Sequence, residues 1–213
     1  CLWASMKTGL SVKWTSDRTE AFLTDAHGRD YISMAQIGFD SDNKFVGLKV
    51  NTKAIFGAYM SLFSSAVPTY LYATLLSGQY NISNIYCDVQ AVYTNTAPVD
   101  AYRGAGRPEA CYLVERIMET AARELGVSPV ELRRQNFITE FPHETPVIMT
   151  YDVGDYAANL EQAMEASNYN SFNKRRVEAQ KRGKLRGLGM SCYIEACGIA
   201  PSAAVGSLGA GVG

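Results

Sequence analysis

Residues that bind metals or cross-link a chain are scarce in this sequence. Its 213 residues include two histidines and five cysteines, and no two cysteines form a CxxC pair. This scarcity argues against a zinc site and against a disulfide framework. Cys192 and Cys197 are open to two interpretations, a redox pair or small apolar residues in or beside a strand. His27 and His143 lie in turn-like sequences, where a solvated loop histidine is the simpler interpretation.

An excess of charge of either sign and long apolar runs are also absent. The 20 lysines and arginines nearly balance the 21 aspartates and glutamates, which leaves a net charge of -1. Such a balance argues against a general nucleic-acid or membrane-surface binder. No segment approaches the ~20 consecutive apolar residues of a membrane span, and no cationic and then apolar leader opens the chain. With 47% hydrophobic residues, the chain can form one or two packed domains, and we expect a cytoplasmic protein.

Strand-like and helix-like patterns alternate along the chain. A turn-rich tetrapeptide, residues 41–44, separates two strand-like runs and predicts an antiparallel hairpin. Residues 54–102 contain no lysine or arginine, which suits a buried wall or a cofactor-facing surface, and plain core is the simpler interpretation for most of them. The predicted strands are residues 12–14, 31–39, 45–51, 85–93 and 188–194. The predicted helices are one at the opening of the chain, residues 108–125, a short one from the cap Ser128 to Arg134, one that carries Leu160 and Met164, and one that carries the basic cluster 174–176.

The most informative stretch is residues 101–110, Ala-Tyr-Arg-Gly-Ala-Gly-Arg-Pro-Glu-Ala. Its two glycines can adopt positive φ angles and allow a ligand to approach the backbone closely. The helix that follows offers free N-terminal amides and a partial positive charge. Together with Arg103 and Arg107, these features favour a phosphate or another oxyanion. The alternative is a tight turn whose arginines are solvated or pair with nearby carboxylates such as Glu109.

The order of several motifs resembles the large subunit of molybdenum hydroxylases of the xanthine dehydrogenase and aldehyde oxidase superfamily. The loop is preceded by Tyr-Thr-Asn-Thr at residues 93–96 and followed by Glu-Leu-Arg-Arg-Gln-Asn-Phe-Ile at 131–138. Matching motifs also lie upstream at residues 12–20 and downstream at Tyr151-Asp152 with Gly154 and at 187–189. The resemblance covers essentially the whole sequence in order, which is far more specific than any single motif.

This resemblance implies an α+β fold of mixed strands and helices, part of the molybdopterin-binding domains of such a subunit. Residues 1–135 would form part of the first molybdopterin-binding domain, with the active-site loop at 101–107. Residues 136–213 would form a connector and the truncated start of the second domain. No methionine opens the chain and a glycine-rich run closes it, so we expect an internal segment that is inactive alone.

Within the superfamily, the loop resembles that of the second form of the aerobic carbon monoxide dehydrogenase large subunit. That form reads Tyr-Arg-Gly-Ala-Gly-Arg, as residues 102–107 do here. In the authentic carbon monoxide oxidisers the loop reads Tyr-Arg-Cys-Ser-Phe-Arg, and its cysteine carries a copper ion bridged by sulfur to molybdenum. Gly104 occupies the place of that cysteine and has no ligand atom. The resemblance therefore implies no copper, and no residue is assigned as a metal ligand.

The resemblance further implies a molybdenum-dependent oxidoreductase that contains molybdopterin cytosine dinucleotide. Electrons would pass to iron–sulfur clusters on a small partner subunit and to FAD on a medium one, in a dimer of heterotrimers. Any membrane association would be made through these partners. The implied cofactor contacts are Tyr102, Arg103, Gly104, Ala105, Gly106 and Arg107.

Not all of these residues carry the same implied role. Arg103 and Gly104 are the candidates at the catalytic centre, whereas Arg107 has the alternative role of holding the helix start. The family's catalytic base lies outside this sequence, so Glu195 is not assigned to it. The small side chains at residues 104–106 imply a wide pocket, and we expect hydroxylation of an aldehyde or heteroaromatic carbon with water. One alternative is genuine oxidation of carbon monoxide to carbon dioxide. Another, of a different class, is a non-catalytic α/β domain that grips an anion or a partner.

Overall fold

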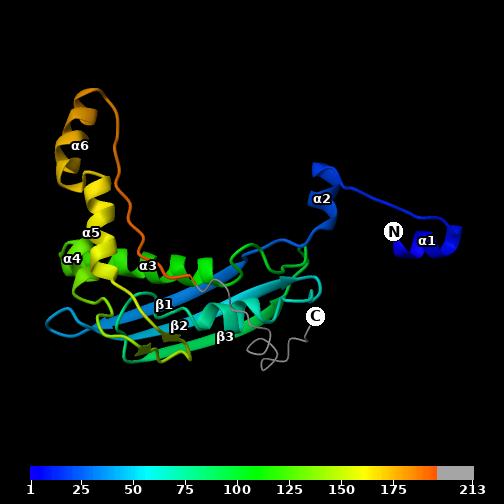
Figure 1. The fold of residues 1–213 in the computed structure, drawn as a ribbon, viewed down its shortest axis with the longest axis horizontal. Helices are drawn as coiled ribbons and strands as arrows, with labels where there is room; N and C mark the ends of the chain where they lie inside the picture. Colours follow the sequence, from blue (N-terminus) through cyan, green and yellow to red (C-terminus); the bar gives the residue numbers. More distant parts are fainter. Residues whose placement is uncertain (196–213) are drawn as a thin grey trace.

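The structure is a computed structural model that describes residues 1–195. Mixed helices and strands follow one another along the chain (Figure 1), which confirms the expected α+β class. The elements are α1 (Leu2–Thr8), α2 (Arg18–Thr24), β1 (Tyr31–Phe39), β2 (Phe45–Gly57), the π-helix η1 (Val67–Leu71), β3 (Ile85–Tyr93), α3 (Arg107–Leu125), α4 (Pro129–Arg134), β4 (His143–Glu144), β5 (Thr150–Tyr151), α5 (Tyr156–Ala166), the 3-10 turn η2 (Tyr169–Ser171) and α6 (Phe172–Lys181). No helix in this part of the chain is long and apolar enough to cross a bilayer.

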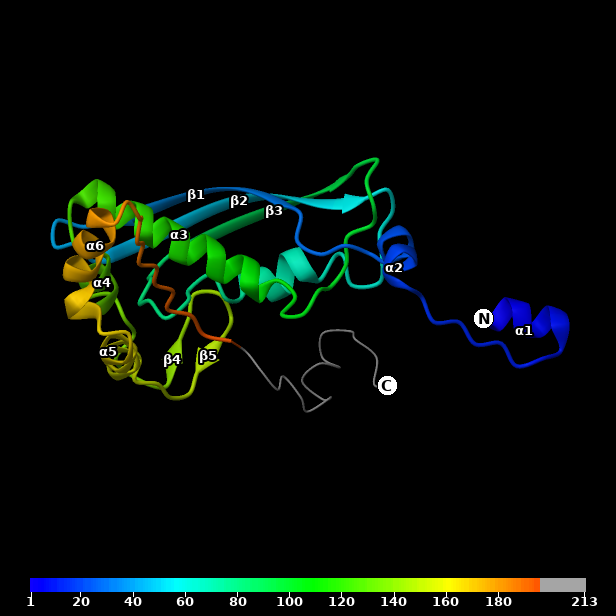
Figure 2. The ribbon, with the colours of Figure 1, turned by 90° about the horizontal axis from the view of Figure 1, so that it is seen from above.

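A three-stranded sheet with the order β1-β2-β3 forms the centre of the molecule. The predicted hairpin is confirmed: β1 and β2 are antiparallel, and the carboxylate of Asp40 accepts the amides of Asp42 and Lys44 across the turn. β3 then pairs with β2 in parallel, so the chain must cross over between them. This crossover contains η1 and lies on the same side of the sheet as α3 (Figure 2).

The main core lies between the sheet and α3. Alternate residues of β2 point toward the helix, and Val50 is fully buried. The three- and four-residue spacing of apolar residues in α3 buries Leu113, Val114 and Met118 on one face. Tyr80, from the crossover, is also completely buried. The crossover therefore contributes core, but most of residues 90–102 are exposed, so the expectation of plain core for most of residues 54–102 is wrong.

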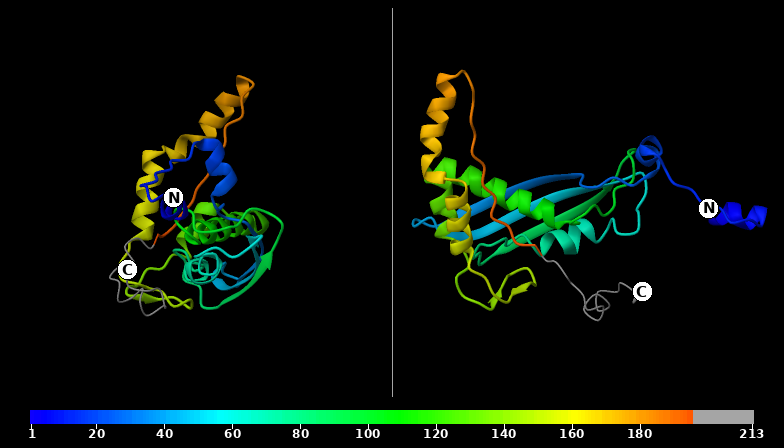
Figure 3. Two further views of the ribbon diagram at one scale, coloured as in Figure 1. Left: turned by 90° about the vertical axis from the view of Figure 1, so that its right-hand side faces the viewer. Right: turned by 45° about the horizontal axis from the view of Figure 1, so that its top comes forward.

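Two predicted strands are wrong. Residues 12–14 lie in an extended arm between α1 and α2 that leaves the body of the molecule (Figure 3), where no strand is available for pairing. Residues 188–194 form no strand either. This segment returns from α6 along α3 (Figure 1), and its backbone bonds to the side chains of Glu115 and Gln79 instead of to a neighbouring strand.

The next two α-helices, α4 and α5, begin at side-chain caps, and the cap of α4 is the one that the sequence predicts. Gly126, at a φ of 69°, ends α3 in the left-handed conformation. The side chain of Ser128 accepts the amide of Glu131 at the start of α4. Asp155 does the same for Ala158 at the start of α5. The short connection after α3 places α4 beside the C-terminal half of α3, and α5 follows there after the β4 and β5 strands (Figure 1).

Candidate functional site: an arginine-flanked loop at the start of α3

The predicted loop, residues 101–106, leads directly into the N-terminus of α3. Three consecutive residues have positive φ angles, 99° at Gly104, 39° at Ala105 and 83° at Gly106. The amide of Ala105 donates to the carbonyl oxygen of Tyr102 at 2.8 Å and closes the turn. The conformation that the sequence predicts for the two glycines is therefore confirmed.

Both glycines are needed for close packing within the chain. A Cβ on Gly106 would lie 2.5 Å from the carbonyl oxygen of Val67 and 2.7 Å from the carbonyl carbon of Leu71, in η1. A Cβ on Gly104 would lie 2.5 Å from Cγ of Pro108. The loop is thus fitted against η1 on one side and against the first turn of α3 on the other. A bulky side chain at Gly104 would distort the loop itself, so such a variant does not measure the width of a pocket.

Arg29, which lies two residues before β1, supports the loop. Its guanidinium donates to the carbonyl oxygen of Arg103 and lies 4.7 Å from the ring centre of Tyr102. Its Nε lies 3.7 Å from Oε1 of Glu109. The carboxylate that the sequence offers as a partner for the loop arginines is therefore paired with Arg29. Sequence reasoning missed Arg29, because it lies far from the loop along the chain.

The two arginines of the loop have different surroundings. Nη1 of Arg107 donates to the carbonyl oxygen of Gly104 at 3.2 Å, and its Nε lies 3.6 Å from Oε1 of Glu195. Arg107 thus holds the helix start, the alternative role that the sequence left open for it. Arg103 is exposed and makes no ion pair within residues 1–195. Its charge is the one that remains free for an anion.

Asp100 fixes the residues just before the loop. Its carboxylate accepts the hydroxyl of Ser61 and the amides of Phe63 at 3.1 Å and Ala101 at 2.6 Å. Partial burial acts in the opposite direction, but these donors prevail and lower the pKa of Asp100. The carboxylate is therefore ionised at neutral pH. Nothing in the local sequence distinguishes this aspartate, because two of its donors, Ser61 and Phe63, lie on a distant part of the chain.

A buried ionic network lies farther along α3. Nε of Arg133, a fully buried side chain, donates to Oε2 of Glu115 at 3.1 Å, and Nη2 lies at the same distance without making a hydrogen bond. Glu115 also accepts the hydroxyl of Tyr80 and, at 2.7 Å, the amide of Cys192. Burial and the Glu115 carboxylate raise the pKa of Tyr80, so the phenol remains a donor. Sequence reasoning missed Glu115, because a glutamate between apolar helix positions predicts a solvated side chain.

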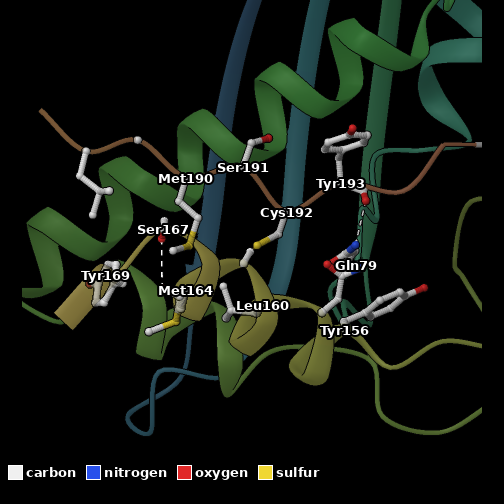
Figure 4. A pocket seen from close by; sticks show the side chains of 14 residues that line it. Gln79, Tyr156, Leu160, Met164, Ser167, Tyr169, Met190, Ser191, Cys192 and Tyr193 are labelled. Atoms are coloured by element: carbon white, nitrogen blue, oxygen red, sulfur yellow. Dashed lines mark hydrogen bonds between the residues drawn. The ribbon is translucent and has the colours of Figure 1, made fainter. Parts of the chain in front are cut away.

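Two cavities flank α3. The first, about 710 Å³, lies between β1 and α3 beside the loop, and Arg29 and Glu109 are among its lining residues. The second, about 520 Å³, lies between α5 and the returning segment 188–193 (Figure 4). Met164, Met190 and Cys192 line this second cavity. Residues 101–107 line neither cavity, and the first adjoins the candidate site through Arg29, which lines it and contacts the loop.

The described residues offer no ready metal site. Within residues 1–195, no three histidine, cysteine, aspartate or glutamate side chains are grouped as metal ligands. Cys1, Cys87, Cys111 and Cys192 are free thiols. Burial, reinforced by the nearby Glu115 carboxylate, raises the pKa of Cys192 to about 11, so this thiol is protonated at neutral pH. Cys197, its proposed redox partner, lies outside the described residues.

The donors of the loop fit an anionic group. The amides of Gly104 and Gly106 make no hydrogen bond within the described part of the chain. They follow Arg103, whose exposed guanidinium makes no ion pair within the described residues, and they precede the N-terminus of a 19-residue helix. Unpaired amides, a helix N-terminus and a guanidinium together favour a phosphate or a similar oxyanion. The chemistry of this donor set therefore suits the phosphate of a pterin cofactor.

Comparisons with known proteins give the family. Residues 1–137 match the molybdopterin cofactor-binding domain. The chain is 37% identical to the carbon monoxide dehydrogenase large chain of Hydrogenophaga pseudoflava, an alignment that covers 98% of this chain and 27% of that protein. It is 31% identical to the nicotine 6-hydroxylase large subunit of Paenarthrobacter nicotinovorans, over 92% of this chain and 24% of that protein.

A solved structure shows the same fold. Quinoline 2-oxidoreductase from Pseudomonas putida 86 superimposes with a TM-score of 0.78 and 31% identity, over 85% of this chain and 23% of that one. The chain thus spans about a quarter of the length of the proteins that it matches. It belongs to the molybdopterin cofactor-binding domain family, in the group of the xanthine dehydrogenase and carbon monoxide dehydrogenase subunits.

Proposed function

We propose that this chain supplies the active-site loop of the large subunit of a molybdenum-dependent oxidoreductase. The observation that carries the proposal is a loop in which the unpaired Arg103 is followed by the unpaired amides of Gly104 and Gly106. These groups would bind molybdopterin, in its cytosine dinucleotide form, with Tyr102, Ala105 and Arg107 completing the loop. When bound, the cofactor supplies the redox chemistry of the molybdenum centre. The protein residues bind, orient and neutralise charge.

Within this function, Arg103 and Gly104 have distinct roles. Arg103 is the cation that faces an anion or a developing negative charge, since no described carboxylate neutralises it. Gly104 leaves its side of the loop without a side chain and without a metal ligand. The nearest cysteine along the chain, Cys111, lies on α3, where its Sγ is 3.7 Å from the hydroxyl of Ser191. Burial raises the pKa of this thiol, which favours its protonated form.

We therefore propose hydroxylation of an aldehyde or heteroaromatic carbon, with oxygen from water. Two of the relatives are named for the heteroaromatic compounds nicotine and quinoline. The absent side chains of Gly104 and Gly106 do not themselves provide the room for such a ring, because Pro108 and η1 fill that space. Carbon monoxide oxidation is the competing activity, because another relative is named for it. Electrons would leave through iron–sulfur clusters and FAD on a small and a medium subunit, in a cytoplasmic dimer of heterotrimers.

The proposed division of the chain follows from the same family. Residues 1–135 would belong to the first molybdopterin-binding domain, and residues 136–213 would connect it to the second. The loop at 101–107 would then lie within the first domain, at the N-terminal end of α3, whereas the proposed boundary follows α4 at the other end of that helix.

The proposal is tested by the cofactor content of the full-length subunit in its complex. Replacing Arg103→Gln removes the free cation, and we expect at least about a tenfold loss of cofactor affinity, measured as molybdenum and pterin per subunit. Arg123→Gln is the matched control, because Arg123 is an exposed arginine in the last turn of α3 that contacts only Thr120 among the described residues. Equal cofactor content in both variants would contradict the role of Arg103.

The substrate class is tested by dye reduction with the loaded complex. An aldehyde, a heteroaromatic compound and carbon monoxide are compared under the same conditions. Turnover of the organic substrates alone would support the proposed hydroxylation. Robust turnover of carbon monoxide would overturn it and would show that Gly104 does not prevent that reaction.

A further inference from the structure

The Arg107 guanidinium connects the loop to a segment far along the chain. One nitrogen, Nη1, donates to the carbonyl oxygen of Gly104 at 3.2 Å, and another, Nε, lies 3.6 Å from Oε1 of Glu195. Because guanidinium is planar and rigid, the position of one contact restricts the other. The carboxylate of Glu195 thus restricts the carbonyl of Gly104 through a single side chain.

The segment that carries Glu195 is itself fixed to the body of the molecule. The amide of Cys192 donates to Oε2 of Glu115 at 2.7 Å. The side-chain amide of Gln79 donates to the carbonyl oxygen of Tyr193 at 2.8 Å (Figure 4). These two bonds hold the backbone on either side of the peptide bond between Cys192 and Tyr193, and Tyr193 is two residues before Glu195. Glu195 therefore reaches Arg107 from an anchored backbone.

The burial of the pair gives the contact more weight than an ordinary surface ion pair. The Arg107 side chain is only 12% exposed, and that of Glu195 is 34% exposed. Partial removal from water strengthens the attraction between opposite charges. It also means that removing the Glu195 charge leaves Arg107 partly buried without its counter-ion.

We propose that Glu195 is a positioning residue for the active-site loop, an inference that rests on the proposed function. Its carboxylate holds Arg107 against the Gly104 carbonyl, and this contact keeps the loop in its positive-φ conformation. The same pairing neutralises Arg107 and leaves Arg103 as the loop's free cation. Glu195 thus acts on the site through Arg107 and does not itself accept a proton from the substrate.

The test uses the full-length subunit in its complex and three variants. Glu195→Gln removes the charge, Arg107→Met removes the guanidinium, and the double variant removes both. Glu178→Gln is the matched control, because Glu178 makes an exposed ion pair with Lys181 at 3.1 Å on α6. The first measurement is the hydrogen exchange of the peptide that spans residues 101–107, which requires neither cofactor nor turnover. The second is the separation of kcat from KM in the loaded complex.

In the Glu195→Gln variant, we expect the hydrogen-exchange rate of the amides in residues 101–107 to rise about fivefold. This factor is the change in an equilibrium constant that corresponds to a favourable charge pair. The exchange rate in β2 should stay unchanged. We expect kcat to fall by a similar factor with KM unaltered, because the loop shifts without losing substrate contacts. The double variant should be no worse than Arg107→Met alone, and the control should match the wild type.

Two results would overturn the inference. One is wild-type exchange in residues 101–107 of Glu195→Gln. The other is a double variant whose effect is the sum of the two single effects, since Glu195 would then act independently of Arg107. A wild-type complex that binds no molybdenum would instead refute the proposed function, and the exchange measurement would still decide the role of Glu195.

Discussion

Arg103 and Arg107 flank the same turn, yet the surrounding chain gives them different chemistry. Arg107 is bound on two sides, by the Gly104 carbonyl and by Glu195. Arg103 contributes its carbonyl to Arg29 and leaves its guanidinium unpaired within residues 1–195. One arginine therefore stabilises the loop and the other gives it a net positive charge. This division explains how a turn can be both rigid and attractive to an anion.

The glycines of the loop make the first residue-scale prediction. Gly106→Ala should lower the free energy of unfolding by about 3 kcal/mol. The new Cβ would clash with η1, and the positive φ of this residue is unfavourable for alanine. Gly126→Ala is the control, since Gly126 also has a positive φ but nothing within 4 Å of an added Cβ. We expect it to cost about 1 kcal/mol. Urea unfolding measures both, and equal losses would mean that the loop does not pack closely on η1.

Local sequence predicted the conformation of the loop but not its partners. Two glycines between arginines and before a helix pattern suffice to predict positive φ angles, because φ preferences depend on the residue itself. The contacts from Arg29 and Glu195 depend on how distant segments pack against α3. Asp100 and Glu115 were missed for the same reason. A side chain's sequence neighbours do not show which donors the fold will bring to it.

At the scale of elements, α3 organises the candidate site. Its N-terminus receives the loop, its apolar face covers the sheet, and Glu115 on another face binds the returning segment through the amide of Cys192. The predicted bounds of this helix, residues 108–125, differ by one residue from the observed Arg107–Leu125. Its long amphipathic pattern made it predictable. By contrast, residues 188–194 have a strand-like pattern but form no strand. Their backbone bonds to the side chains of Glu115 and Gln79 instead.

The buried network of α3 gives an element-scale prediction. Arg133→Met leaves the buried Glu115 carboxylate without its guanidinium, so we expect it to lower the free energy of unfolding by about 3 kcal/mol or more. Arg134→Met is the adjacent control, because Arg134 makes only partly exposed ion pairs with Glu131 and Glu161. Such pairs contribute roughly 0.2–1 kcal/mol each.

Urea unfolding of the two variants distinguishes a buried network from a surface one. A further variant, Arg133→Met combined with Glu115→Leu, should recover part of the loss, since it removes the unpaired charge as well. Equal midpoints for Arg133→Met and Arg134→Met would contradict the structure. They would mean that water reaches Arg133 and that Glu115 is not a buried anchor for the returning segment.

At the scale of the whole molecule, the parallel pairing of β2 with β3 places the loop. Because β2 and β3 are parallel, the chain must cross back over the sheet between them. This crossover carries η1 across the face that α3 also covers (Figure 2). Gly106 then meets η1 where the chain turns into α3. The sequence predicted each of these strands but not the order β1-β2-β3. Strand order depends on which faces of the elements pack together. The pattern of residues along the chain does not predict this packing.

The N-terminal arm is separate from this architecture. α1 and α2 bury no side chain, and the first backbone contacts with the body are the bonds of His27 to Pro98 and Asp100. The large apolar side chains exposed in the arm are Leu2, Trp3, Met6, Leu10, Val12, Trp14, Phe22 and Leu23. The sheet and α3 therefore form their core without the arm (Figure 3).

Both tryptophans of the chain, Trp3 and Trp14, lie in this arm, so fluorescence tests its independence directly. When the 213-residue chain is heated, circular dichroism should report a cooperative transition of the body. Tryptophan emission should remain that of exposed indole throughout, because the two side chains are 73% and 56% exposed.

A truncation that removes residues 1–25 should shift the midpoint by less than about 2 °C. Removing residues 1–30 is the control, because it also deletes the bonds of His27 and the Arg29 contacts with the loop and Glu109. We expect that longer truncation to lower the midpoint by roughly 5 °C or more. An emission change at the same midpoint as the dichroism would contradict the structure, since the arm would then unfold together with the body.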